Sequence, residues 1–204
     1  MINKLKIAVF ASLFGLVFIC SSCGGNPKVE KTKPEVVKEN QENEFAAQMS
    51  LPDACSFISI EELKVIVGDA VDEVQIKDAT NSQSKHARSC FFKWEHEGMP
   101  NSGLMAQVQS NPIPDEFPTW PKVFIESKKS TGEKTLAAGG GELSYTYENF
   151  PIGLDGAYNF ELGKYFWRLD DDLVYMLAFN LPVEEETLTD WATKIATKIS
   201  ARAK

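Results

Sequence analysis

The first 23 residues constrain the fold more than any other part of the sequence. They predict that an N-terminal leader is cleaved off, so that only the rest of the chain folds. Two lysines, an apolar run of about 14 residues at positions 7–20, and two serines precede Cys23 in that order. This order is typical of a secretory signal peptide. The apolar run is shorter than the roughly 20 residues that a membrane-spanning helix needs. We therefore expect residues 1–22 to be cleaved off and the remainder to fold outside the cytoplasm.

The end of this leader reads Phe18-Ile19-Cys20-Ser21-Ser22-Cys23-Gly24-Gly25 and resembles the lipobox of bacterial lipoprotein precursors. The resemblance implies cleavage after Ser22, a diacylglycerol thioether on the Cys23 sulfur, and loss of Cys20 with the signal peptide. Two or three acyl chains would hold the protein on a cell membrane or outer membrane, at about 0.8 kcal/mol per buried methylene. Glycines follow Cys23 at positions 24 and 25, where an aspartate would be linked to retention in the inner membrane. The resemblance therefore favours the periplasmic side of an outer membrane, if the cell has one. Secretion without lipid and an uncleaved anchor are the alternatives.

Residues 23–50 read as the lipidated N-terminus and a flexible tether. The segment is rich in Lys, Glu, Asn and Pro and has no sustained apolar period. Such a composition buries too little apolar surface to offset the entropy of ordering. About 27 flexible residues have a root-mean-square reach of roughly 30 Å. The alternative is a helix at residues 35–48 that docks on the domain, with Val36, Val37 and Phe45 as its main apolar residues.

The chain is acidic. Its net charge is −8, and removing Lys4 and Lys6 with the leader takes away two positive charges and makes it −10. An acidic domain is repelled by anionic lipid headgroups and by nucleic acid. Basic clusters are short, as at Lys128-Lys129, and form no patch suited to a phosphate backbone. We therefore expect membrane attachment through the lipid, and no nucleic-acid partner.

Two cysteines are left for the folded domain once the leader is gone and Cys23 is acylated, namely Cys55 and Cys90. An even pair in an exported domain is most simply a disulfide. Closing a loop of about 36 residues would stabilise the domain by roughly 3 to 4 kcal/mol. His86 and His96 flank Cys90, so a thiol hydrolase or a His/Cys metal site is the alternative. On an extended strand these side chains would lie more than about 10 Å apart.

Residues 51–204 are predicted to form one α+β domain, in which a short N-terminal helix, a middle helix and a C-terminal amphipathic helix cover an antiparallel meander. Ser59 and Glu62 form a capping box before an apolar run that stops at Gly68, which predicts the first helix. Alternating apolar residues at 90–94 and 104–108 predict two paired strands. The other expected elements are a strand at 71–76, a loop through Lys85 and Arg88, a middle helix from Trp120 that ends within 128–134, strands at 143–147, 157–162, 165–169 and 173–179, and a closing helix at 188–202.

Three short motifs follow one another in residues 51–202. They are Pro52-Asp53-Ala54-Cys55, Cys90-Phe91-Phe92-Lys93-Trp94, and Gly153-Leu154-Asp155-Gly156-Ala157-Tyr158. Together with the closing helix, they resemble a broad family of small, uncharacterised bacterial lipoproteins, whose members carry a Cys-x-x-x-Trp strand and a Gly-x-Gly-Asp turn. This sequence departs from the turn motif by placing Asp155 before Gly156. The resemblance implies an extracytoplasmic, disulfide-linked domain without an established enzymatic activity.

No catalytic motif stands out, because GxSxG, HExxH and EF-hand patterns are absent. The segment Gly132-Glu133-Lys134-Thr135 resembles the tail of a phosphate-binding loop, but it lacks the upstream glycine and reads as a solvated turn. The run Asp170-Asp171-Asp172 lacks the distal glutamate of a calcium loop and reads as a solvated hairpin turn. At least three of the four tryptophans are expected in the core rather than on a carbohydrate-stacking platform.

We therefore expect a non-catalytic, lipid-anchored lipoprotein of the cell envelope, with neither cofactor nor metal. It would bind an envelope protein partner through its sheet face and the loops around Asp155 and Asp170. A periplasmic lipoprotein that binds a small molecule and an extracytoplasmic hydrolase are the alternatives. The first needs a concave apolar pocket, and the second needs a pocket with convergent polar groups.

Overall fold

The chain forms an α+β fold, as the sequence predicted, in a computed structural model that describes residues 51–68, 71, 73–96 and 98–203. The expected leader, Cys23, the expected tether and the alternative helix at 35–48 lie outside the described residues. The elements in chain order are η2 (Ala54–Ser56), α1 (Ile60–Val67), β1 (Gln75–Asp78), β2 (Ala87–His96), β3 (Met99–Ser110), α2 (Trp120–Ser130), β4 (Glu133–Leu136), β5 (Glu142–Tyr145), β6 (Glu148–Asn149), β7 (Asp155–Asn159), β8 (Lys164–Arg168), β9 (Leu173–Asn180) and α3 (Glu185–Arg202).

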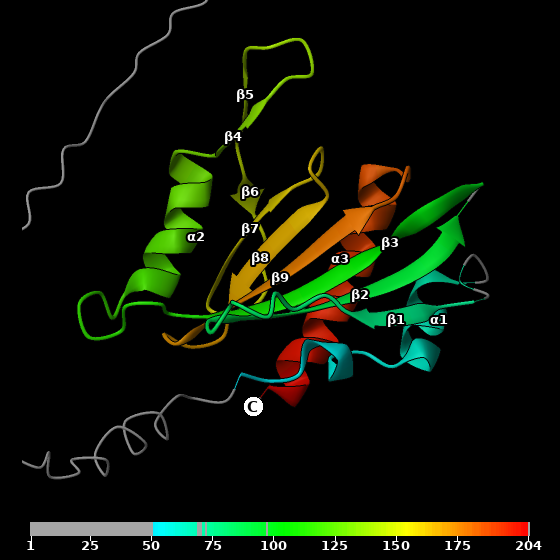
Figure 1. Ribbon diagram of the computed structural model, residues 1–204, viewed down its shortest axis with the longest axis horizontal. Helices are drawn as coiled ribbons and strands as arrows, with labels where there is room; N and C mark the ends of the chain where they lie inside the picture. The colour runs from blue at the N-terminus through cyan, green and yellow to red at the C-terminus, as the bar shows by residue number, and fades with distance from the viewer. Residues whose placement is uncertain (1–50, 69–70, 72, 97, 204) are drawn as a thin grey trace, which may run out of the picture. The chain divides into compact units, whose positions relative to one another are not determined.

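The main sheet consists of two antiparallel meanders that meet at one pair of strands. Its strand order is β1-β2-β3-β9-β8-β7-β6, so that β3 of the first meander pairs with β9 of the second (Figure 1). The expected pairing of the two early strands is confirmed, with Cys90 opposite Ala106 and Phe92 opposite Leu104. Between the meanders the chain forms α2 and the hairpin of β4 and β5, which is a separate two-stranded sheet.

One face of the main sheet carries the larger hydrophobic core, which α1 and α3 cover. Cys90, Phe92 and Trp94 of β2 are at most 2% exposed in this core. Their neighbours Phe91 and Lys93 are only partly buried on the opposite face, so the predicted alternation along β2 is confirmed. The helix α3 runs behind the sheet in Figure 1. It contributes the buried side chains of Leu188, Trp191, Ala192, Ile195, Ala196 and Ile199.

Polar contacts fix the start of α1 and join it to the end of α3. The Glu62 amide donates to the Ser59 hydroxyl at 3.2 Å, and the Ser59 amide donates to the Glu62 carboxylate at 3.0 Å, which confirms the predicted capping box. The Arg202 guanidinium contacts the Glu62 carboxylate at 2.6 Å and donates to the Phe57 carbonyl at 2.7 Å. These donors, the Ser59 amide first, lower the pKa of Glu62 to about 2. One glutamate thus caps the first helix and holds the last.

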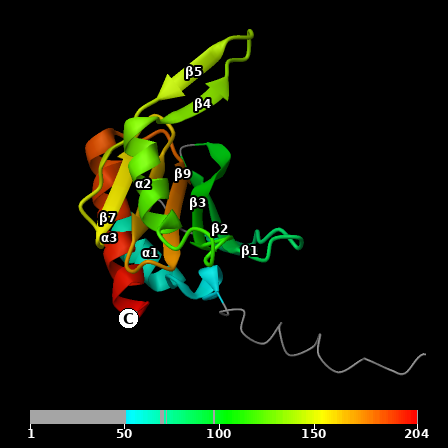
Figure 2. The ribbon, with the colours of Figure 1, turned by 90° about the vertical axis from the view of Figure 1, so that its left-hand side faces the viewer.

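The helix α2 covers part of the opposite face of the sheet. Ile125 is fully buried there against Phe166 of β8 and Met176 of β9, in a second and smaller core. Phe124 adds an edge-on ring contact with Phe166 at 5.4 Å. Figure 2 shows α2 lying along the sheet, with the hairpin of β4 and β5 extending beyond its end. No helix in the described ranges is long and apolar enough to cross a membrane.

Four local predictions were wrong. The strand expected in the meander at residues 143–147 is β5, which pairs with β4 in the separate two-stranded sheet. The first strand is Gln75–Asp78 rather than residues 71–76; it is an exposed edge strand, so no alternation of burial marks it. Residues 133–136 form β4, paired with β5, and not a solvated turn. Arg88 lies within β2 opposite Val108, and not in a loop. In each case, a neighbouring strand supplies hydrogen bonds that the local sequence does not indicate.

Candidate functional site

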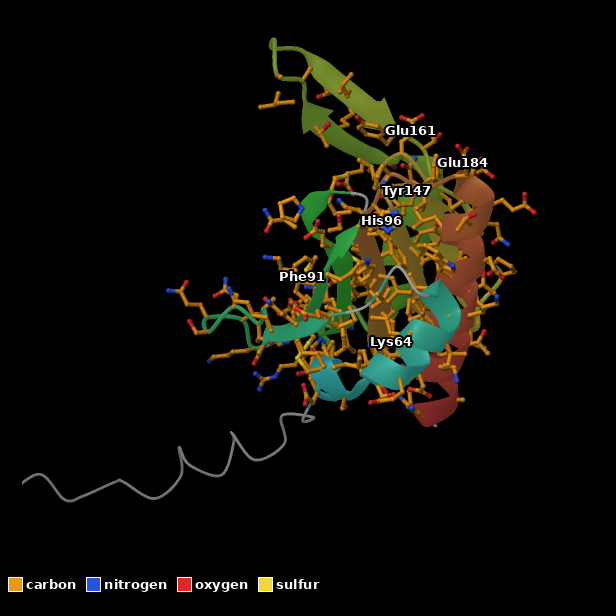
Figure 3. The ribbon with its side chains drawn as sticks, turned by 90° about the vertical axis from the view of Figure 1, so that its right-hand side faces the viewer. Lys64, Phe91, His96, Tyr147, Glu161 and Glu184 are labelled. Atoms are coloured by element: carbon orange, nitrogen blue, oxygen red, sulfur yellow. A yellow bond between two sulfur atoms is a disulfide. The ribbon has the colours of Figure 1, made fainter. Side chains whose placement is uncertain are left out.

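Two adjacent hollows lie at the end of the sheet where β9 passes into α3. They share two lining residues, Phe160 and Glu161, in the turn between β7 and β8. The larger hollow has a volume of about 490 Å³ and the smaller one about 190 Å³. Figure 1 shows the β7–β8 turn and the start of α3 at the same end of the sheet, and Figure 3 shows Glu161 and Glu184 there. We call the two hollows together the end groove.

The larger hollow, which we call the apolar part of the end groove, is lined mainly by apolar residues together with Glu161 and Asn180. Its lining includes Met99, Leu162, Phe179, Leu181, Val183 and Leu188. Phe179 and Leu188 are 7% and 2% exposed and form its floor, whereas Met99 at the rim is 37% exposed. Apolar side chains that stay accessible side by side in a concavity are typical of a binding surface.

A glycine brings the β7–β8 turn close to the end of β9. Gly163 has a φ of 61° in this turn, and a Cβ built on it would lie 2.5 Å from the Phe179 carbonyl oxygen. The Phe179 amide donates to the Gly163 carbonyl at 2.9 Å. Because only glycine combines this backbone conformation with so close an approach, Gly163 sets the shape of the apolar part.

The smaller hollow is the acidic part of the end groove. Three exposed glutamates line it, Glu148, Glu161 and Glu185. The Tyr158 hydroxyl donates to the Glu148 carboxylate at 3.1 Å and lies 3.4 Å from the Glu185 carboxylate. Burial first, and then the Glu148 carboxylate, raises the pKa of Tyr158 to about 12, so this phenol is a neutral donor at physiological pH. None of the ion pairs found among the described residues involves these three glutamates.

A series of aromatic rings joins the floors of the two parts. Phe179 contacts Tyr165 edge-on with ring centroids 5.8 Å apart, and Tyr165 stacks on Tyr158 at 5.5 Å. The Tyr165 hydroxyl lies 3.1 Å from the Thr189 hydroxyl of α3. Because packed rings in a core hold fixed geometries, the apolar and acidic parts are expected to keep a constant spacing.

The end groove is suited to binding rather than to nucleophilic chemistry. Neither hollow is lined by a His, Cys, Ser, Lys or Arg side chain. Its floor is apolar, and its charged groups are carboxylates, of which Glu161 lines both hollows. A ligand that places an apolar group in the larger hollow and a positive charge in the smaller one would match both parts.

The predicted cysteine pair is confirmed. Cys55 and Cys90 form a disulfide with a sequence separation of 35 residues, which links η2 to the centre of β2. The Cys90 sulfur is bonded and its residue is fully buried, so it cannot serve as a nucleophile in this state. The hydrolase alternative thereby loses its candidate thiol.

The two histidines do not form a site with Cys90. His86 precedes β2 and His96 ends it, so about ten strand residues, or roughly 30 Å, separate them. The His86 Nδ1 lies 3.2 Å from the Ser110 hydroxyl. His96 is 7% exposed, and neither of its ring nitrogens has a hydrogen-bond partner among the described residues. Figure 3 shows His96 near the end of the domain that carries Glu161.

The acidic residues chosen from the sequence have local structural contacts. The Asp170 carboxylate accepts hydrogen bonds from the amides of Asp172 and Leu173, both at 2.9 Å, and so shapes the β8–β9 turn. Asp155 begins β7 and pairs with Lys129 at 2.6 Å. Among the described residues, no group of three His, Cys, Asp or Glu side chains could hold a metal ion. Three of the tryptophans are buried as predicted, Trp94, Trp167 and Trp191.

A second polar cluster holds the hairpin of β4 and β5 against α2 and β8. The Glu133 carboxylate contacts the amino groups of Lys128 and Lys164, and it accepts a hydrogen bond from the Tyr147 hydroxyl at 2.8 Å. These three donors outweigh burial and lower the pKa of Glu133 to about 2. Burial and the Glu133 carboxylate raise the pKa of Tyr147. Because the carboxylate is bound from three sides, this cluster is structural rather than an open site.

The end groove was not predicted from the sequence. Its lining comes from four separate segments: the start of β3, the chain from β6 to the β7–β8 turn, the end of β9 and the first turn of α3. The one local signal is the run Leu181-Pro182-Val183, a partly apolar connection between β9 and α3. No family model, no curated protein and no solved structure matches this chain.

Proposed function

We propose that this chain is a lipid-anchored lipoprotein of the bacterial cell envelope, and that its domain binds a protein partner without catalysing a reaction. The observation that carries the proposal is the leader followed by Cys23, which predicts export and acylation. The disulfide between Cys55 and Cys90 supports it, because such bonds persist in extracytoplasmic compartments. Gly24 and Gly25 after Cys23 favour the periplasmic side of an outer membrane, where the cell has one.

The end groove supports the binding role. It combines an apolar hollow with three carboxylates that have no cationic partner among the ion pairs of the described residues. The domain carries excess negative charge, which keeps it away from anionic lipid and leaves the groove accessible to a partner. A tether of about 27 residues would give the domain room to reach that partner.

Metabolic labelling with palmitate tests the anchor. Cells that produce the native chain should incorporate the label into this protein, and Cys23→Ala should abolish the incorporation. Cys20→Ala is the matched control, because this neighbouring cysteine is expected to leave with the leader, and the variant should stay labelled. Undiminished labelling of Cys23→Ala would show that the sulfur of Cys23 is not the acylation site.

A small-molecule-binding lipoprotein is the second candidate. It is favoured by the volume of the apolar hollow, about 490 Å³, which falls within the range of ligand pockets. Against it stands the exposed rim at Met99 and Pro182, since most small-molecule sites enclose their ligand. A thermal shift of several degrees with a small organic cation, and none with a peptide, would favour this candidate.

A further inference from the structure

We propose that the end groove binds an extended peptide segment of an envelope protein in which apolar residues adjoin basic ones. This inference deepens the proposed function and rests on its binding role, but it does not depend on acylation of Cys23. The occupant is inferred from the shape of the groove, from the order of its apolar and acidic parts, and from the charge of the domain.

The shape of the groove favours a chain over a compact ligand. The two hollows share Phe160 and Glu161 and are therefore adjacent, with mainly apolar residues around the larger one and three carboxylates around the smaller one. The rim residues Met99, Pro182 and Glu185 are exposed, which leaves the groove open to solvent. Two adjacent hollows that are open to solvent suit an extended peptide, because successive side chains of the peptide can enter one hollow and then the other.

The apolar part supplies the area for anchoring side chains. Leu162, Leu181 and Val183 are partly exposed in the free domain and would be covered by a leucine- or phenylalanine-sized side chain. Buried apolar anchors near the centre of an interface provide most of its affinity. Phe179 and Leu188 lie beneath them in the core, so the surface does not need to rearrange.

The acidic part determines the charge of the ligand. Glu148, Glu161 and Glu185 present three carboxylates within one small hollow, and the neutral Tyr158 hydroxyl offers no compensating charge. A lysine or arginine next to the apolar anchors would relieve the repulsion among these carboxylates. An acidic peptide would be rejected by the same groups and by the net charge of the protein, −8 for the whole chain.

The experiment measures binding of a defined peptide to the purified native chain, whether it is recovered from the membrane or from the soluble fraction. The probe is a fluorescent peptide of three apolar residues followed by three basic ones, Leu-Phe-Leu-Lys-Arg-Lys with blocked ends. The comparison peptide replaces the basic residues with Glu-Asp-Glu. We expect the basic probe to bind at least about tenfold more tightly, and we expect its affinity to fall several-fold when salt is raised from about 0.05 to about 0.5 M, because rim charges are screened.

Two groove variants and one matched control locate the binding. Glu161→Gln combined with Glu185→Gln should weaken the basic probe about five- to tenfold, and Leu181→Ser should weaken it by a similar factor. Glu186→Gln removes a neighbouring exposed charge of α3 that does not line either hollow, and it should leave the affinity unchanged. Unchanged melting temperatures would confirm that each variant is folded.

Four outcomes would overturn the proposal. The first three are no binding of the basic probe at about 1 mM, equal binding of the acidic peptide, and equal loss of affinity in Glu186→Gln and the groove variants. If n-octylammonium binds as tightly as the peptide, the ligand is a small cation rather than a chain, and the proposal is also wrong. Because the palmitate experiment reads only the anchor, failure of either experiment leaves the other result intact.

Discussion

Removal of the Cys55–Cys90 disulfide should cost the domain a large share of its stability. The two residues are 35 positions apart, and in the chain-entropy model a closed loop of this length contributes about 3 to 4 kcal/mol. The bond also fastens η2 to the middle of β2, where Cys90 is fully buried. For a domain of this size, 3 to 4 kcal/mol corresponds to a fall in melting temperature of about 8 to 14 °C.

Guanidinium titration of the Cys55→Ala/Cys90→Ala double variant, followed by tryptophan fluorescence, measures this loss. The buried Trp94 and Trp167 report unfolding of the core. The native chain should lose the same amount of stability when dithiothreitol is added, and the double variant should not respond to the reductant. The m-value should rise on removal of the bond, because the uncrosslinked unfolded chain exposes more surface.

Two results would contradict the expected loss of stability. If the double variant unfolds within about 1 kcal/mol of the native chain, the entropic contribution worked out from the loop length is wrong. If dithiothreitol destabilises the double variant as well, the reductant acts somewhere other than Cys55 and Cys90.

Two further predictions concern the packing of the domain. Glu133→Gln should lower the free energy of unfolding at pH 7 by about 2 kcal/mol, whereas Glu142→Gln, which removes an exposed pair, should cost less than about 1 kcal/mol. The pKa of Glu133 is about 2 in the folded state against an ordinary 4.5, so its contribution to stability is present above pH 4.5 and is lost as the pH falls toward 2. Near pH 2 the native chain and Glu133→Gln should therefore show the same free energy of unfolding in denaturant titrations. Gly156→Ala should destabilise the domain by about 1 to 3 kcal/mol, because the added Cβ would lie 2.4 Å from the Phe150 carbonyl oxygen. Gly139→Ala is the control, because a Cβ at that position meets open space. Equal melting temperatures for the two alanine variants would contradict this prediction.

Local chemistry explains which parts of the fold could be predicted from the sequence. The capping box of Ser59 and Glu62 depends on residues three positions apart, and the structure has the helix where that pair requires it. The strand at 90–94 was predictable because Cys90, Phe92 and Trp94 face a core while their neighbours do not. The closing helix was predictable for the same reason at a period of 3.6 residues.

Features that depend on distant partners could not be predicted in this way. The pairing of β3 with β9 joins residues such as Leu104 and Phe179, and no local pattern specifies it. The strand β4 is short and mostly exposed, so only its partner β5 identifies it as a strand. The end groove has the same origin, because Phe160, Leu181 and Glu185 come together only when the β7–β8 turn packs beside the start of α3.

An intact-mass measurement, without reduction, of the protein purified from its native membranes tests the proposed export and acylation directly. We expect a chain that begins at Cys23, carries the mass of a diacylglycerol group with or without a further acyl chain, and is two hydrogens lighter than the fully reduced form because Cys55 and Cys90 are bonded. A chain that still begins at Met1, or one without added lipid mass at Cys23, would contradict the central claim that this is an exported lipoprotein.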